Sequence, residues 1–366
     1  MDNEQKSQGP LSGVKILDLS AVVSGPMAAV MLADQGADVI KVEPPGWGDG
    51  VRGLGASRNG ISAIFSMINR NKKSIAINIK HPKGQELVKQ LAQSADVLLQ
   101  NYRPGKLDQL GLGFDDLHAI NPELIYASIN GMGEVGPYAG QKVYDYVIQG
   151  ISGVLDAQSD HSSESASAHS DLSMVRTIIY DKVTSLTAAQ GITAALFARE
   201  RGAGGQHLQL AMLDAALYFN WPDLMWNYAF KGDGVDYAGD LADMYEINQA
   251  NDGAIVSHRL GADTSDYSTE QLIDLFAQNE IPISRANRRE DVLSDPQIAA
   301  LGTLEEFEHP RAGPMIHPRA PMRFSKTKHP EHLPSPDLGQ HTVEILMELG
   351  YDMPQLQDLA RAGAIA

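Results

Sequence analysis

The chain has 366 residues, of which 43% are hydrophobic and 20% charged, a globular composition with room for about two domains. Its net charge of −17 argues against nucleic acid as a main partner, because phosphate binding needs a cationic surface. The sequence contains no cysteine, which excludes disulfides, thiolate metal sites and cysteine nucleophiles and fits a cytoplasmic location.

Two further segments bear on location. Residues 1–10 are polar and lack an apolar core, so we expect no secretory signal. The longest apolar stretch, residues 183–198, is interrupted by threonine, serine, glutamine and glycine. It predicts a buried helix rather than a membrane span, and we expect no membrane association.

The first third of the chain alternates short β-branched runs with helical patterns. The predicted strands are residues 14–18, 38–42, 74–79, 96–100 and 124–129, and the predicted helices are residues 26–35 and 82–93. Such alternation is typical of a doubly wound α/β fold with a parallel sheet. Ligands of these sheets bind beyond the carboxyl ends of the strands.

The middle and the end of the chain are less regular. Residues 156–173 are serine-rich and polar, which predicts an exposed, mobile loop. A long helix is predicted at 182–201, ended by the glycines of 202–205. Residues 221–260 show weak periodicity, and short helices are predicted at 269–278, 289–301 and 342–349.

Two motifs admit a functional and a structural interpretation. Residues 131–136 spell G-x-G-x-x-G after a strand, but loop residues follow where a dinucleotide fingerprint needs a helix, so we expect no NAD site. No carboxylate falls at ligand spacing from the histidines at 309, 317, 329 and 332, so we expect solvated loop histidines and no metal.

Asp181 stands directly before the apolar stretch of the long predicted helix. It can be an N-cap, whose carboxylate accepts hydrogen bonds from free backbone N–H groups. It can equally be a carboxylate nucleophile, which the helix N-terminus would keep ionised with a pKa at or below about 3.9. Local spacing leaves both interpretations open.

Many ordered segments resemble family III CoA-transferases over nearly the whole chain. They are residues 11–20, 24–26, 32–44, 48–49, 69–74, 95–97, 101–105, 110–112, 121–126, 181–182, 199–200, 205–206, 212–215, 295–297, 309–310 and 338–342. The resemblance implies a Rossmann-like large domain, residues 1–215 with 320–366. It also implies a smaller inserted domain with linkers, residues 216–319, here shortened after residue 253. Two such chains are expected to interlock as rings in a homodimer.

The resemblance also implies a reaction and a site. Asp181 corresponds to the nucleophile that forms an aspartyl-CoA thioester while CoA moves between an acyl-CoA and a carboxylic acid. The positions that correspond to coenzyme A contacts are Val22, Val23, Ser24, Ile77, Lys80, Asn101, Tyr102, Arg103, Lys142, Tyr144 and Met212. Arg103 and Lys142 would supply cations for the phosphates of CoA.

Two alternatives remain at this level. α-Methylacyl-CoA racemases share the fold and use a histidine–glutamate pair as a second base. Here the histidine position falls on Tyr144 and the glutamate position near Ala262 and Asp263, and a phenol is a poor base at neutral pH. The second alternative is a protein that binds CoA or acyl-CoA with little or no turnover.

Overall fold

The computed structural model describes residues 9–159, 172–328 and 330–366, and the chain divides into two compact units. Unit 1 comprises residues 1–152, 174–219 and 306–366, and unit 2 comprises residues 153–173 and 220–305. The predicted polar N-terminus lies mostly outside the described residues, as does most of the serine-rich segment. Within the described residues, no helix has the length and apolar content needed to cross a membrane.

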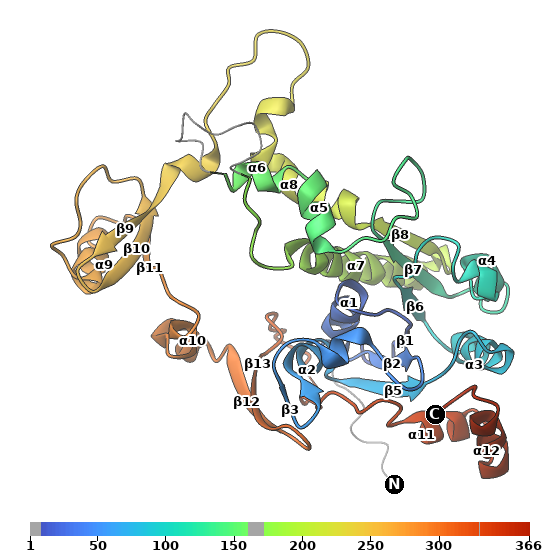
Figure 1. The fold of residues 1–366 in the computed structure, drawn as a ribbon. Coiled ribbons are helices and arrows are strands. Elements are labelled where there is room, and N and C mark those ends of the chain that lie inside the picture. The colour runs from blue at the N-terminus through green and yellow to red at the C-terminus, as the bar shows by residue number, and fades with distance from the viewer. Residues whose placement is uncertain (1–8, 160–171, 329) are drawn as a thin grey trace. The chain divides into compact units, whose positions relative to one another are not determined.

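Unit 1 is built on a six-stranded sheet whose neighbouring strands are all parallel (Figure 1). The strands are β1 (Lys15–Asp18), β2 (Asp38–Glu43), β5 (Lys72–Ala76), β6 (Val97–Gln100), β7 (Ile125–Asn130) and β8 (His207–Ala211). Their order across the sheet is β5-β2-β1-β6-β7-β8, which is the order of doubly wound dinucleotide-binding folds. The predicted α/β fold with a parallel sheet is therefore confirmed.

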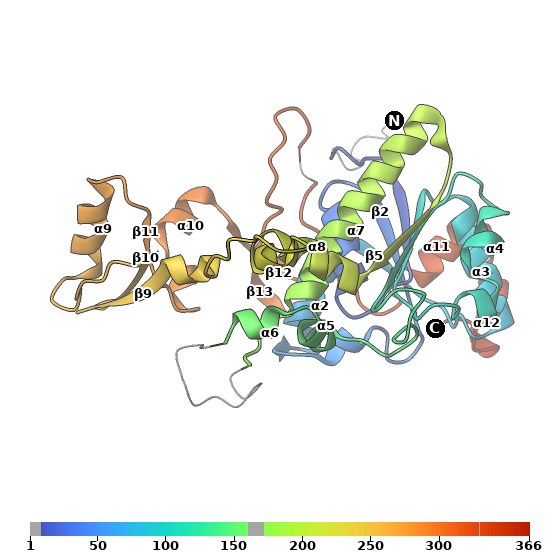
Figure 2. The ribbon, with the colours of Figure 1, turned by 90° about the horizontal axis from the view of Figure 1, so that it is seen from above.

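Helices cover both faces of this sheet. In unit 1 they are α1 (Ser24–Ala33), α2 (Ala63–Asn69), α3 (Pro82–Gln93), α4 (Phe114–His118), α5 (Asp145–Ile151), α7 (Ile179–Ala198), α11 (Thr342–Glu348) and α12 (Met353–Arg361). α1 and α7 pack together on one face (Figures 1 and 2). α3, α4, α11 and α12 bury leucines and isoleucines against the other face.

Alternation along the strands decides what each face carries. Leu17, Val42 and Ile75 point into the core that α3 and α11 cover. Asp18, Lys41 and their neighbours therefore point to the α1 face, because successive side chains of a strand alternate. In the register of the sheet Asp18 lies opposite Lys41. The sheet thus places buried charges beneath α1.

Unit 2 holds a three-stranded antiparallel sheet in the order β11-β10-β9. Its elements are α6 (Val154–Ala157), β9 (Tyr245–Ala250), β10 (Gly253–His258), α9 (Thr269–Ala277), β11 (Ile283–Arg285) and α10 (Pro296–Leu301). α8 (Met212–Leu224) and β12 (Leu304–His309) span both units, and β3 (Ser57–Arg58), β4 (Ile61–Ser62) and β13 (Gly313–Pro318) belong to unit 1.

Several boundaries differ from the prediction. β8 was not predicted, because it is a short edge strand in which only Ala211 is buried. β9 and β10 were missed in the region of weak periodicity, since half of each strand is exposed. The helix predicted at 289–301 is reduced to a 3₁₀ turn, Asp291–Leu293, and α10. The long helix begins at Ile179 and ends at Ala198.

Candidate active site

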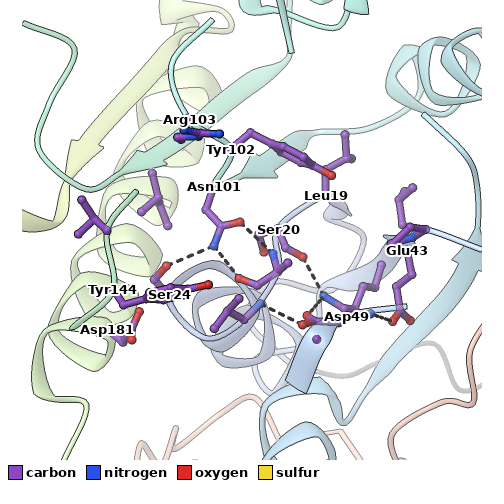
Figure 3. A pocket seen from close by; sticks show the side chains of 18 of the residues that line it. Leu19, Ser20, Ser24, Glu43, Asp49, Asn101, Tyr102, Arg103, Tyr144 and Asp181 are labelled. Atoms are coloured by element: carbon purple, nitrogen blue, oxygen red, sulfur yellow. Dashed lines mark hydrogen bonds and ion pairs between the residues drawn. The ribbon is translucent and has the colours of Figure 1, made fainter. Parts of the chain in front are cut away.

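A cavity of about 560 Å³ lies in unit 1 at the carboxyl ends of β1 and β6 (Figure 3). This is the point where the strand order reverses, which is the usual ligand site of doubly wound sheets. Its lining residues are Leu19, Ser20, Ala21, Val22, Ser24, Lys41, Val42, Glu43, Pro44, Gly48, Asp49, Gly50, Asn101, Tyr102, Arg103, Ile129, Lys142, Val143, Tyr144, Asp181 and Met212.

The cavity brings together most of the predicted site residues. Those that line it are Val22, Ser24, Asn101, Tyr102, Arg103, Lys142, Tyr144, Asp181 and Met212. Three predicted contacts do not line it. Val23 packs against Phe65 and Ile68, Ile77 lies in the core on the other face of the sheet, and Lys80 is exposed.

Asp181 is the third residue of α7 and is 9% exposed. The N-cap interpretation is corrected, because the helix begins three residues earlier than the N-cap position required, with Ile178 at the N-cap. The Asp181 carboxylate faces the cavity and has a backbone hydrogen bond with Ser24, which Figure 3 shows beside it. The fold therefore places this carboxylate at a cavity rather than at a helix cap.

The predicted ionisation of Asp181 is also corrected. Burial raises the pKa of Asp181 to about 6, and the negative charge of Asp145 adds to the increase. The backbone hydrogen bond with Ser24 acts in the opposite direction but is the smaller effect. The helix N-terminus, which lowers the pKa of a nearby carboxylate, does not determine the pKa of Asp181, because the effect of desolvation is larger than that of the helix dipole. A more basic carboxylate is a stronger nucleophile, and at pH 7 to 8 it is still largely ionised.

Asp145, which the sequence analysis did not identify, stabilises the first turn of α7. Its Oδ1 accepts hydrogen bonds from the backbone N–H groups of Tyr180, at 2.7 Å, and of Asp181, at 3.3 Å. Its Oδ2 accepts a 2.6 Å hydrogen bond from Nε2 of Gln149. Asp145 lies 36 residues before Asp181, so only the folded chain reveals the pair.

Two buried ion pairs lie beneath α1, and one of them, Lys41 with Asp49, lines the cavity. Nζ of Lys72 lies 2.9 Å from Asp18, and Nζ of Lys41 lies 2.9 Å from Asp49, with all four side chains at most 1% exposed. Burial acts to raise the pKa of Asp18, but the ammonium groups of Lys72 and Lys41 outweigh it and hold that pKa below its ordinary value. Burial lowers the pKa of Lys72 to about 8 despite Asp18.

The rim of the cavity carries cations. Arg103 and Lys142 are exposed, and Nζ of Lys142 lies 5.2 Å from the centre of the Tyr144 ring. Residues 131–143, which contain the G-x-G-x-x-G motif, form turns and no helix, so they lack the geometry of a dinucleotide fingerprint. Among the described residues, no three histidine, aspartate or glutamate side chains are arranged to hold a metal ion. The expectation of solvated loop histidines is wrong for His309 and His317, which are buried in β12 and β13.

Comparison with known proteins identifies relatives. The model of CoA-transferase family III matches residues 11–264 and 238–342. Human succinyl-CoA:glutarate CoA-transferase is 33% identical, over 97% of this chain and 90% of its own. Formyl-CoA:oxalate CoA-transferase of Rhodopseudomonas palustris is 31% identical over 97% of each chain. The crystal structure of a CAIB/BAIF family protein from Brucella suis has a TM-score of 0.79 and 29% identity, over 93% of this chain and 99% of that one.

Proposed function

This chain belongs to CoA-transferase family III and is a CoA-transferase, and we propose that it moves CoA through a thioester on Asp181. The observation that carries the proposal is a carboxylate only 9% exposed that lines a cavity of about 560 Å³ beyond the sheet. Burial and Asp145 make this carboxylate more basic than a solvated aspartate. Both properties suit a nucleophile.

The reaction proceeds by exchange at two carbonyl groups. An oxygen of Asp181 attacks the thioester carbonyl of the donor, the C–S bond breaks, and a mixed anhydride and CoA thiolate result. The thiolate attacks the aspartyl carbonyl and expels the donor acid, which leaves the aspartyl-CoA thioester. The acceptor acid reverses these steps, forms its own CoA thioester and restores the carboxylate of Asp181. Exclusion of water protects the anhydride.

In this proposal the remaining pocket residues bind CoA. Arg103 and Lys142 stand at the rim, where phosphate groups keep contact with solvent. Val22, Ser24, Asn101, Tyr102, Tyr144 and Met212 line the path between the rim and Asp181. The acceptors in the relatives' names, glutarate and oxalate, are dicarboxylic acids, so we infer a dicarboxylic acceptor here.

We also infer that two chains form an interlocked homodimer in the cytoplasm, as the family resemblance implies. Support comes from large apolar side chains left exposed in unit 1, with Phe197 62%, Tyr218 86% and Phe219 54% exposed. Exposed apolar surface of this kind marks protein interfaces. Sedimentation at equilibrium tests the dimer, and a monomer at micromolar concentration would contradict it.

The test of the reaction is intact-protein mass spectrometry after incubation with succinyl-CoA and no acceptor. We expect a CoA adduct that hydroxylamine removes, and its absence from Asp181→Asn. Asp214→Asn, at an exposed aspartate of α8, is the control and should form the adduct. Acceptor acids are then compared as a panel. An adduct that persists in Asp181→Asn contradicts the proposal, and so does deuterium loss from an α-labelled 2-methylacyl-CoA without acceptor, which indicates a racemase.

A further inference from the structure

The loop between β1 and α1 contains a valine in an unusual backbone conformation. Val22 has a φ of 69°, in the left-handed region. Among the described residues, the other non-glycine residues with positive φ are Asn59, Asn71 and Glu280. Asparagine tolerates this region, whereas a β-branched side chain clashes with the backbone there. Contacts outside the loop must therefore impose the conformation of Val22.

The side chain of Asn101, which follows β6, holds the residue before Val22. Its Oδ1 accepts a 2.9 Å hydrogen bond from the backbone N–H of Ala21, and its Nδ2 donates a 2.6 Å hydrogen bond to the carbonyl oxygen of Ala21. One amide side chain thus binds both backbone groups of Ala21. These two hydrogen bonds fix the orientation of the Ala21 backbone, from which the chain turns at Val22.

The side chain of Asp49, in the loop after β2, holds Val22 itself. Its Oδ1 accepts a 3.1 Å hydrogen bond from the N–H of Val22, and its Oδ2 lies 2.9 Å from Nζ of Lys41. Lys41 also donates a 2.8 Å hydrogen bond to the carbonyl oxygen of Ser20. Lys41 and Asp49 are both buried, and Figure 3 shows Asp49 among the hydrogen-bonded side chains of the cavity.

Beyond Val22 the turn brings the chain to Asp181. Ser24 has its backbone hydrogen bond with the Asp181 carboxylate, and its carbonyl oxygen accepts a 2.8 Å hydrogen bond from Oγ of Ser185, one turn along α7. Gly25 lies so close to Ser20 that an added Cβ would be 2.2 Å from the Cβ of Ser20. The chain must double back tightly for Ser24 to reach Asp181.

We propose that Asp49 is a positioning residue, which holds Val22 in the left-handed conformation and so directs the N–H of Ser24 to the Asp181 carboxylate. The inference rests on the proposed function, because it assumes that Asp181 reacts. The Ser24 hydrogen bond orients the carboxylate and stabilises its ionised form, so that an oxygen is aimed at the thioester before attack. Asp49 itself does not touch the reacting atoms in this scheme.

A double-mutant cycle between Asp49→Ala and Val22→Gly tests the proposal. Glycine adopts positive φ without strain, so it does not need Asp49 to reach this conformation. In the protein with Val22 we expect Asp49→Ala to lower kcat/KM about tenfold or more. This is about the factor by which a residue other than glycine prefers the right-handed to the left-handed backbone conformation. In the Val22→Gly background we expect the same substitution to cost less than about threefold.

The pH profile supplies a second readout that a purely structural role would not move. Loss of the Ser24 hydrogen bond should shift the acidic limb of kcat/KM to higher pH in Asp49→Ala, because the ionised form of Asp181 is less stabilised. When Val22→Gly is added to Asp49→Ala, the acidic limb should return towards that of the parent. Asp49→Asn keeps an oxygen for the Val22 N–H and should lose less activity than Asp49→Ala. If Asp49→Ala does not fold, Asp49→Leu, which has no oxygen for the Val22 N–H, replaces it in the cycle.

Glu280→Gly is the matched control background, because Glu280 also has positive φ but belongs to unit 2. There Asp49→Ala should cost as much as in the parent. An equal cost in the Val22→Gly background, or an acidic limb that does not respond to Val22→Gly, overturns the role of Asp49. If the parent protein forms the CoA adduct but the cycle shows no coupling, only this inference is contradicted. If the parent protein forms no adduct, the proposed function is contradicted.

Discussion

The backbone N–H of Asp181 donates a 3.3 Å hydrogen bond to Oδ1 of Asp145, so a carboxylate of α5 binds the first turn of α7, which carries Asp181. Asp145 compensates the free N–H groups of that turn, a role that an N-cap side chain usually fills. The arrangement leaves the carboxylate of Asp181 available to the cavity. The arrangement also places the negative charge of Asp145 beside Asp181, whose ionised form burial already disfavours.

The pH dependence of kcat/KM should respond to the negative charge of Asp145. In the proposed mechanism Asp181 must be ionised to attack, so we expect kcat/KM to fall as pH drops through about 6. Asp145→Asn keeps an oxygen for the N–H groups of α7 but removes the charge, so the acidic limb should move to lower pH. The limb should remain above 3.8, because burial is the larger cause. Asp214→Asn is the control, and an unmoved limb in Asp145→Asn would refute the coupling.

Asp181→Asn should stabilise the folded protein while it abolishes turnover. The ionised carboxylate is disfavoured in the fold, and an increase in pKa from 3.8 to about 6 corresponds to about 3 kcal/mol at most. Because the folded pKa is the higher one, this destabilisation is absent below pH 3.8 and complete above about 6. We therefore expect urea denaturation at pH 8 to give Asp181→Asn a larger free energy of unfolding than the parent, and at pH 4 a nearly equal one. Lower stability of the variant at pH 8 would contradict the pKa.

The rim cations should act on binding more than on chemistry. Arg103→Ala and Lys142→Ala should each raise the KM for acyl-CoA, by about tenfold for a lost phosphate contact, with a smaller change in kcat. Comparison with 3′-dephospho-acyl-CoA assigns the phosphate, since the variant that lacks the 3′-phosphate contact no longer discriminates between the two donors. Lys80→Ala, at an exposed position outside the cavity, is the control. Unchanged KM in both rim variants would remove them from the CoA site.

A buried pair outside the cavity should affect stability alone. Arg70 binds Asp34 through two contacts, Nε to Oδ1 at 3.0 Å and a second nitrogen to Oδ2 at 2.5 Å. Arg70→Met removes the guanidinium group from the buried carboxylate and should lower the free energy of unfolding by about 3–5 kcal/mol. The double variant Asp34→Leu/Arg70→Met should recover much of the loss. We expect kcat/KM of the folded variants to stay within twofold of the parent, and a loss of stability below about 1 kcal/mol would contradict the estimate.

The sequence alone predicted five of the six strands of the parallel sheet and the long helix at whose start Asp181 lies. Strands such as β1 and β6 are buried on both faces, so their apolar runs are continuous and easy to recognise. In β9 the residues Glu246, Asn248 and Ala250 alternate with exposed ones in a strand without a fully buried residue, and the hydrophobic pattern is too weak to predict it. The order of segments along the chain also carried the family resemblance, which pointed to Asp181.

The tertiary structure decided the electrostatics. Local spacing placed Asp181 near a helix N-terminus, which favours a low pKa, yet burial and Asp145, 36 residues away, reverse the direction. Asp49 meets Val22 across 27 residues, and Asn101 meets Ala21 across 80. Helices and strands can be predicted from local patterns because the periodicity of their apolar side chains is local, even though the hydrogen bonds of the sheet join distant segments such as β1 and β6. The ionisation of a side chain depends on every charge and every layer of protein around it, and only the folded chain brings these together.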